Sequence, residues 1–216
     1  MKFYKTILFT ACLFMVTESQ GQKSFTEGSL IYTNSVETGS AEPKMADMFD
    51  GSTTTVYLKG NQSRTEMASV LGSEATIYNA STGSAVILKN YSGQSLMITL
   101  TPQDWDKNNK KYDGITFETT GETAEIAGFN CHKAIAKLKD GSSFTVYYTT
   151  DVAIPNKSYD YKFKTLPGLA VQYEGQNGAK KFKVTLSKIN FTPVPPSKFE
   201  IPKSGYRVLT YEEAKK

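Results

Sequence analysis

Short runs of alternating apolar and polar residues fill most of the chain, and this two-residue period constrains the fold more than any other feature. The period is cleanest over residues 181–188, where the apolar side chains must leave the backbone on one side: Phe182, Val184 and Leu186. Turn-forming pairs that tolerate positive φ separate such runs: Gly60-Asn61, Asp140-Gly141 and Asn177-Gly178. The pattern predicts antiparallel strands with one dry face and one wet face.

A sheet with one dry face needs a second layer or must curl on itself. Helical patterns are confined to residues 42–49 and 211–216, and residues 101–114 are expected to form a loop with a helical turn. Pro193 to Pro196 should carry the chain to a last strand at 199–201. With 216 residues, one domain is expected. We therefore predict a mainly β protein: a single curved antiparallel sheet, or half-barrel, with one or two short helices.

The N-terminus has the layout of a secretory signal peptide. Lys2 and Lys5 precede an apolar run over 6–16, and the chain then turns polar. The run is well short of the roughly 20 residues that span a bilayer as a helix. Small residues at Ser19 and Gly21 predict cleavage after Gly21. This gives a signal peptide at 1–21, one β domain at 22–216, and a periplasmic or secreted protein without a transmembrane segment in the mature chain. A retained anchor is the alternative.

Two cysteines are present, and one lies in the expected signal peptide. Cys12 follows Thr10-Ala11 and could be a lipoprotein cysteine, an alternative that the sequence leaves open. Cleavage leaves Cys131 as the one thiol, so no internal disulfide can form, and we expect this residue to be buried as a small hydrophobe. Its neighbour His132 is the only histidine. Adjacent strand residues project from opposite faces, so the two cannot act as nucleophile and base.

Other sequence motifs of catalytic and metal sites lack residues that they require. With His132 interpreted as an ordinary strand residue, no other histidine is available for a Ser-His-Asp triad, and nearly all zinc sites are excluded as well. The oxygens of Asp104, Asp106 and Asn108 resemble the start of a calcium loop, but the required glycine and final glutamate are missing. The net charge is +4 and no long basic block occurs, which argues against nucleic-acid partners. We therefore expect a protein that is not an enzyme, with no catalytic residues, metal or cofactor.

One face of the predicted sheet could hold an apolar guest. Small residues in the strand over 130–139 would leave room beside flexible Met67. From the alternation, eleven residues are expected to line a single space: Met67, Ile77, Val86, Leu88, Ile98, Ala134, Ala136, Val146, Tyr148, Val171 and Val184. A register error of one residue would move a whole strand's set to the other face. The alternative is a core filled by larger neighbours.

Five sequence segments together resemble the DUF4412 family of exported proteins, which is common in Bacteroidetes. They read YLKGNQSRTEM (57–67), AGFNCHKA (127–134), VYYT (146–149), LPGL (166–169) and FEIP (199–202). Their order and spacing fit over nearly all of the mature chain. This family is similar in fold to the LolA and LolB lipoprotein carriers, in which a curved antiparallel sheet wraps around acyl chains under a helical lid. The resemblance implies a LolA-like fold and a lipid or lipidated protein as partner.

These observations favour a non-catalytic exported protein that binds an apolar ligand or a lipidated partner in the concave face of its sheet. Two alternatives stay open. The first is an envelope structural or interaction protein with a filled core and no small ligand. The second is a hydrolase, because strands can bring distant carboxylates together in ways that local spacing does not reveal.

Overall fold

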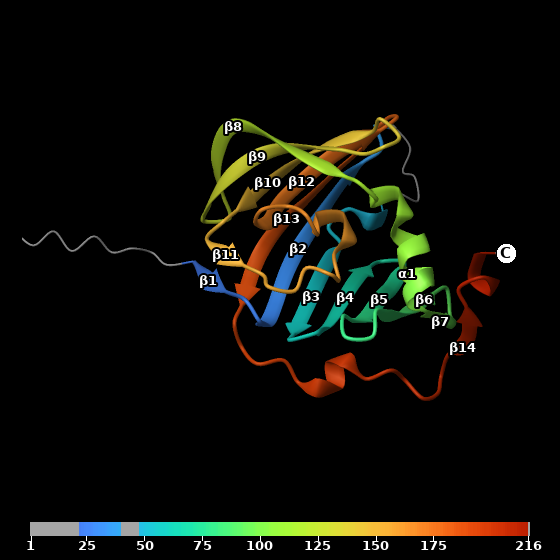
Figure 1. Cartoon of the computed structure of the whole chain (residues 1–216). Coiled ribbons are helices and arrows are strands. Elements are labelled where there is room, and N and C mark those ends of the chain that lie inside the picture. Colours follow the sequence, from blue (N-terminus) through green and yellow to red (C-terminus); the bar gives the residue numbers. More distant parts are fainter. Residues whose placement is uncertain (1–21, 40–47, 216) are drawn as a thin grey trace, which may run out of the picture.

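A computed structural model describes residues 22–39 and 48–215 of the chain. The expected signal peptide at 1–21, Cys12 and residues 42–47 of the expected helix lie outside the described residues. Strands dominate the fold (Figure 1). Twelve of them form one sheet, in the spatial order β14-β7-β6-β5-β4-β3-β2-β13-β12-β10-β9-β8.

Eleven of the twelve strands form two antiparallel meanders joined along one strand pair, and the twelfth, β14 (Arg207–Thr210), pairs in parallel with β7. The first meander comprises β2 (Glu27–Glu37), β3 (Thr53–Lys59), β4 (Gln62–Ser69), β5 (Gly72–Asn79), β6 (Ser84–Tyr91) and β7 (Gln94–Leu100). The second comprises β8 (Thr116–Ile126), β9 (Phe129–Lys137), β10 (Ser143–Thr149), β12 (Leu169–Asn177) and β13 (Lys180–Asn190). The antiparallel pairing of β2 with β13 joins them, with Tyr32 opposite Leu186.

The turns predicted from the sequence are confirmed. Gly60, Gly141 and Gly178 have φ values of 56°, 83° and 60°, which residues with a side chain rarely adopt. Each turn joins two adjacent antiparallel strands: β3 to β4, β9 to β10 and β12 to β13. The hairpin signals therefore fix the local topology of the sheet.

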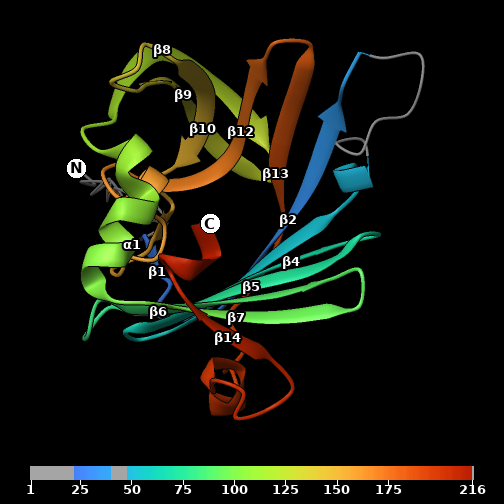
Figure 2. The same cartoon turned by 90° about the vertical axis from the view of Figure 1, so that its right-hand side faces the viewer.

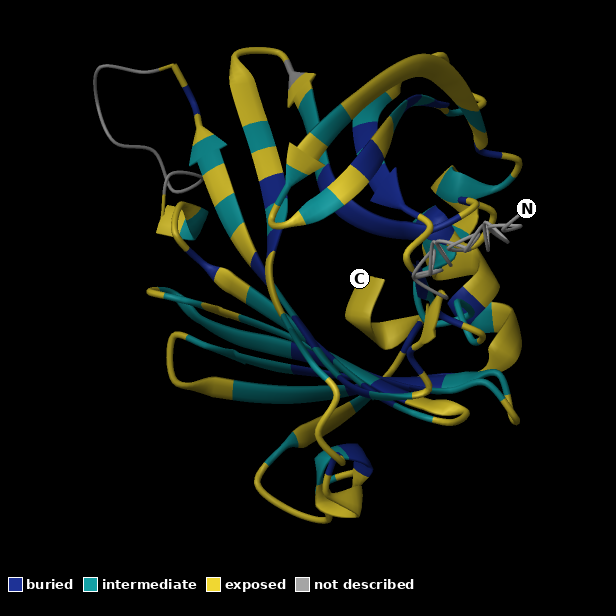
Figure 3. Cartoon of the chain, turned by 90° about the vertical axis from the view of Figure 1, so that its left-hand side faces the viewer, coloured by how far each residue is buried: buried dark blue, intermediate teal, exposed yellow. Residues whose placement is uncertain are grey.

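The sheet is strongly curved, as predicted, and stays open between its edge strands β8 and β14 (Figures 1 and 2). Register shifts interrupt the pairing of β10 with β12 at Tyr147/Tyr148 and that of β13 with β2 at Leu186/Lys188. A third lies between β8 and β9. Such bulges bend a strand and increase its twist. The two meanders consequently face each other across a concave side, and buried and exposed positions alternate along many strands (Figure 3).

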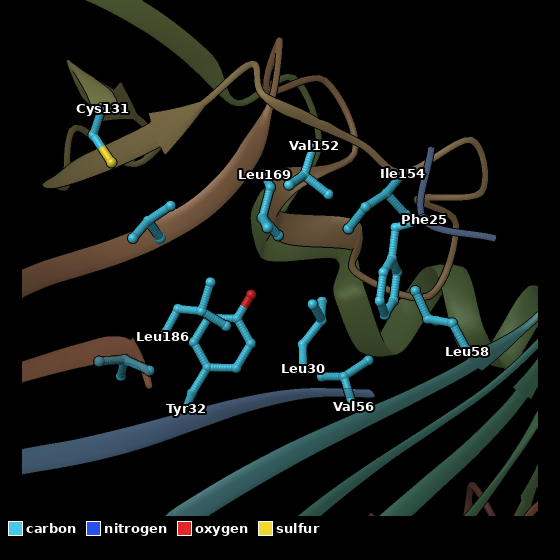
Figure 4. Packing of buried hydrophobic residues seen from close by; sticks show 12 residues of the cluster. Phe25, Leu30, Tyr32, Val56, Leu58, Cys131, Val152, Ile154, Leu169 and Leu186 are labelled. Carbon is cyan, nitrogen blue, oxygen red and sulfur yellow. The ribbon is translucent and has the colours of Figure 1, made fainter. Parts of the chain in front are cut away.

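The main core lies where the two meanders meet. Leu30 and Tyr32 of β2 pack with Val56 of β3 and with Leu169 and Leu186 from the second meander (Figure 4). Full burial of such a side chain stabilises the fold by roughly 1.5–3 kcal/mol. A two-stranded parallel sheet borders this core: β1 (Lys23–Ser24) and β11 (Val152–Ala153).

The segment after β7 forms an α-helix, where the sequence predicted only a loop with a helical turn. Helix α1 (Pro102–Asn109) begins with a capping box in which Thr101 and Asp104 satisfy each other's backbone N–H groups, and Pro102 occupies its first turn. The 3-10 segment η2 (Lys110–Tyr112) follows it. Figure 2 shows α1 on the concave side of the sheet. The missed signal was the T-P-Q-D sequence at the helix start.

The chain after β13 crosses the convex face of the first meander before it reaches β14 (Arg207–Thr210) (Figure 1). Tyr206 of this segment packs on a cluster formed by Ala75, Ile77, Val86 and Leu88. The predicted strand at 199–201 is wrong, because the 3-10 segment η4 (Pro196–Phe199) occupies its start. The expected terminal helix is limited to the 3-10 segment η5 (Glu213–Lys215).

Candidate ligand site in the concave face

A cavity of about 240 Å³ lies between the concave face and the segments that cover it. Both meanders supply its floor. The first contributes Tyr32, Thr54, Val56, Thr65 and Thr76, and the second contributes Tyr173 and Val184. The cavity therefore exists only in the complete sheet.

The pairing register explains why these residues share one face. Directly opposed residues in antiparallel strands project to the same side. Tyr32 lies opposite Thr54, and Thr65 lies opposite both Val56 and Thr76. Thr54 is two residues from Val56 on the same face, so it forms a slanted threonine row with Thr65 and Thr76 across the floor. Tyr173 lies opposite Val184 in the second meander. The floor is apolar with a few hydroxyl groups, as ligand sites commonly are.

Helix α1 and the segment 159–163, which includes the 3-10 segment η3 (Tyr161–Phe163), form the roof. The roof residues that line the cavity are Trp105, Tyr159, Asp160, Lys162 and Phe163. The Phe163 ring packs against the ring of Tyr173 with centroids 5.1 Å apart. Aromatic side chains thus enclose the cavity from several sides.

A lysine outside the cavity holds the roof segment in place. Lys157 Nζ donates hydrogen bonds to the backbone oxygens of Leu166 (2.6 Å) and Gly168 (3.0 Å). Burial lowers the pKa of Lys157, and nearby Asp160 partly offsets this effect. Because hydrogen bonds from a charged donor are stronger than neutral ones, these two contacts fix the path of residues 157–168.

Two charged side chains line the cavity. Lys162 Nζ lies 3.6 Å from the ring centroid of Tyr173 and 4.6 Å from that of Phe163. Burial raises the pKa of the Asp160 carboxyl, although the Lys162 charge and two backbone N–H groups act against this shift. Burial also raises the pKa of Tyr32 and Tyr159. Tyr32 and Tyr159 therefore stay neutral, and besides tyrosines the ionisable groups of the cavity are one carboxyl group and one ammonium group.

One hydrogen-bond donor of the wall has no acceptor. Trp105 is 7% exposed, and its indole Nε1 has no partner among the described residues. The buried Tyr32 hydroxyl, in contrast, donates to the backbone oxygen of Ala170 at 3.1 Å. A buried unsatisfied donor is rare in folded proteins and unfavourable by about 1–3 kcal/mol.

The structure separates the eleven residues predicted to line one space. Seven lie on the concave face: Met67, Ile98, Ala134, Ala136, Val146, Tyr148 and Val184. Of these, Val184 lines the cavity. Val171 is buried in the cluster that contains Tyr32. The prediction of a common face is wrong for Ile77, Val86 and Leu88, which lie on the convex face under Tyr206.

The space in front of the small residues of β9 is occupied by the chain itself. Ala134 and Val146 pack against Phe163 of the roof segment and against Leu166, which follows that segment. The alternative of a core filled by larger neighbours therefore holds for this part of the concave face. The remaining empty volume lies farther along the sheet, over β2 to β5.

Cys131 and His132 lie in different environments. The Cys131 side chain is buried in the main core, where burial raises its pKa to about 11, whereas His132 is exposed. No cluster of His, Cys, Asp or Glu that could hold a metal occurs in residues 22–39 and 48–215. None of the helices within these ranges has the length and apolarity needed to cross a bilayer.

A larger depression of about 450 Å³ lies on the opposite face of the sheet. Its lining includes Ser35, Glu174, Lys181 and Lys183. Ser35 and Glu174 lie opposite Lys183 in the neighbouring strands. Because Lys183 precedes the cavity residue Val184 on β13, its side chain points to the opposite face of the sheet. The two lysines are exposed and the surface is highly polar. The smaller aromatic cavity is the better candidate for a ligand site.

Comparisons with known proteins identify a family. The model of a domain of unknown function, DUF4412, matches residues 39–154. No curated protein matches the sequence.

Three solved structures resemble the chain at low sequence identity. PNGF-II has 16% identity and a TM-score of 0.48, with coverage of 86% of this chain and 31% of PNGF-II, so the chain spans about a third of that protein. An uncharacterized conserved protein from Thermus thermophilus has 8% identity and a TM-score of 0.48, and the match covers 85% of this chain and 91% of that protein. The Mycobacterium tuberculosis lipoprotein LppX has 12% identity and a TM-score of 0.39, and the match covers 78% of this chain and 89% of LppX. These values assign no activity.

Proposed function

This chain belongs to the DUF4412 family, and we propose that it is an exported, non-catalytic protein that binds a lipid or lipidated partner in the cavity of its concave face. One observation carries the proposal. Side chains of both meanders and of the roof line a partly open cavity of about 240 Å³. Ligand sites are concave and lined mostly by apolar and aromatic side chains with a few polar groups, as this cavity is.

The composition of the wall fits a ligand with an apolar part. Val56, Val184, Phe163 and Trp105 offer apolar surface, and the threonine row offers a few hydroxyl groups. An apolar chain gains roughly 25 cal/mol for each Å² removed from water. The cavity can therefore stabilise an acyl or similar chain without a covalent step.

The same wall argues against hydrolysis by paired carboxylates. Glycoside hydrolysis commonly needs two carboxyl groups on either side of the bond that breaks. Asp160 is the one carboxyl group among the described residues that line the cavity. A binding role needs no second acid.

An interaction protein with a filled core is the second candidate. It is favoured by the packing of Phe163 and Leu166 over Ala134, which fills part of the concave face from within the chain. The two functions differ in one measurable property. A filled core takes up no small apolar molecule, whereas the cavity does.

Export follows from the N-terminal sequence pattern rather than from the described fold. The mature protein should begin at Gln22 and be periplasmic or secreted. The intact mass of protein recovered from the source cell envelope tests this directly. A product that retains Met1 would contradict export with cleavage.

Binding is tested with a cavity-filling pair of variants and decan-1-ol as the probe. Thr65 lines the cavity on β4, whereas Thr55 of β3 lies opposite Glu66 on the other face. Thr65→Phe places a ring in the cavity, and Thr55→Phe makes the same change outside it. Native mass spectrometry and calorimetry should show decanol bound by the wild type and by Thr55→Phe. Binding should be lost in Thr65→Phe. Equal binding by both variants would contradict the proposed site.

A further inference from the structure

We propose that the ligand of the cavity is an amphipath that carries an oxyanion, a carboxylate or a phosphate, and that Lys162 binds this group. The inference rests on the proposed function and names the chemistry of its ligand. It extends the expectation of a purely apolar guest, which the sequence suggested. Two features of the cavity wall support it, and a third sets the sign of its test.

The first feature is an ammonium group without a carboxylate partner. Lys162 Nζ lies over the rings of Tyr173 and Phe163, and none of the described carboxylates is within 4.0 Å of it. Burial acts to lower the pKa of Lys162, but the influence of Tyr173 and Asp160 outweighs it and the pKa is raised. The side chain is therefore a cation at neutral pH. Aromatic faces hold such a charge, and Tyr173 also accepts a hydrogen bond from it, so its remaining N–H groups are available for another acceptor.

The second feature is the free N–H of Trp105. This indole lines the same cavity and is more than nine-tenths buried, yet Nε1 donates to no described atom. Nε1 itself is closed to solvent, so a ligand oxygen would satisfy it only after a small movement of the indole, whereas a bare hydrocarbon would leave it unpaired. Lys162 and Trp105 are both donors only, so together they favour a group that accepts hydrogen bonds.

The third feature is the position of Asp160, which sets the sign of a decisive test. Asp160 lines the same cavity as Lys162, and its carboxyl has a pKa raised by burial. If the ligand is an anion, a negative Asp160 repels it, and removal of this charge strengthens binding. If the ligand is a cation, the same change weakens binding. The Asp160→Asn variant therefore separates the two charge types while it preserves the size of the side chain.

The experiment compares four probes of equal chain length: decanoate, decyl phosphate, decan-1-ol and decylammonium. Their affinities are measured by calorimetry at neutral pH. At least one of the two anions should bind the wild type about tenfold more tightly than decanol. The stronger of the two identifies the oxyanion. Lys162→Met retains the apolar stem and should abolish the advantage of the anion over decanol. Asp160→Asn should increase anion affinity.

Two further variants complete the design. Lys164→Met removes an exposed charge two residues away and should leave every affinity unchanged. Trp105→Phe removes the indole N–H, retains an aromatic ring and should weaken anion binding several-fold. Equal affinity for decanol and both anions would overturn the oxyanion inference and leave the proposed function intact. Tighter binding of decylammonium would also overturn it. If no probe binds, the proposed function fails as well.

Discussion

The indole of Trp105 stacks on the phenol ring of Tyr78, with ring centroids 4.8 Å apart and planes inclined by 26°. This contact fastens helix α1 to the concave face of β5. Trp105 is the only tryptophan in the chain, and it also lines the cavity. The one tryptophan fluorophore of the chain therefore lies at the candidate site.

Intrinsic fluorescence should consequently report occupancy of the cavity. We expect saturable changes in emission of the wild type as decanol or decanoate is added, because a guest replaces water beside the indole. The Thr65→Phe variant, in which a ring occupies the cavity, should show no such change. A constant spectrum at probe concentrations that yield a complex by mass spectrometry would place the bound molecule elsewhere.

Removal of the ammonium group of Lys157 should loosen the roof. Lys157→Met abolishes the hydrogen bonds to Leu166 and Gly168. We expect a loss of about 1–3 kcal/mol in the free energy of unfolding, as for other hydrogen bonds from charged donors. Hydrogen exchange should accelerate over residues 159–166. Lys164→Met serves as the exposed control, and an unchanged exchange rate in Lys157→Met would show that the roof is held by other contacts.

Overpacking at Ala136 should destabilise the fold without an effect on binding. Ala136 is fully buried opposite Phe117 and Phe144 and does not line the cavity. Ala136→Phe should reduce the free energy of unfolding by about 1–3 kcal/mol. Ala68→Phe introduces the same ring at an exposed strand position and is the control. A stable Ala136→Phe protein with weakened decanol binding would mean that the guest lies against β9.

The Cys131 thiol should make stability fall at alkaline pH. Burial raises its pKa from the ordinary value of 9.0 to about 11. The folded state thus holds the thiol proton more tightly than the unfolded state. This contribution is fully present below the unfolded pKa and is lost as the pH rises through the folded pKa. The stability advantage of the wild type over Cys131→Ala should shrink between these two pH values by about 2 kcal/mol. A constant difference would contradict the burial of the thiol.

Thiol labelling offers an independent check on Cys131. At neutral pH the group is protonated and buried, and thiolate is the reactive form. Iodoacetamide should therefore modify the native protein slowly and the unfolded protein rapidly. Rapid modification of the native protein would indicate an exposed thiol.

The sequence predicted the sheet and its hairpins because their signals are local. Alternation over 181–188 and the turn glycines are properties of neighbouring residues, and β13 and its hairpin with β12 follow them. The faces of β6 could not be assigned in this way. Ala85, Val86, Ile87 and Leu88 are all buried, because α1 lies on one side and the segment before β14 on the other. A strand covered on both faces has no alternation to reveal its orientation.

Local sequence patterns could not predict the cavity. Its charged residues, Asp160 and Lys162, lie in a segment without regular periodicity, and only the tertiary fold carries them over the floor. The threonine row had a visible signal in each strand but none that placed Thr65 beside Thr76. Such alignment depends on register between strands, which a single sequence does not fix.

The pairing of β2 with β13 also governs how the protein must assemble. Glu37 lies opposite Lys181, so this junction closes only after almost the whole chain is available. Each meander can form from contacts between neighbours in sequence, whereas their union requires a distant encounter, and such non-local pairing is slow. Since the two meanders supply opposite parts of the floor, a chain halted before that encounter has no site to occupy. A guest that binds only the closed sheet therefore draws the folding equilibrium toward completion.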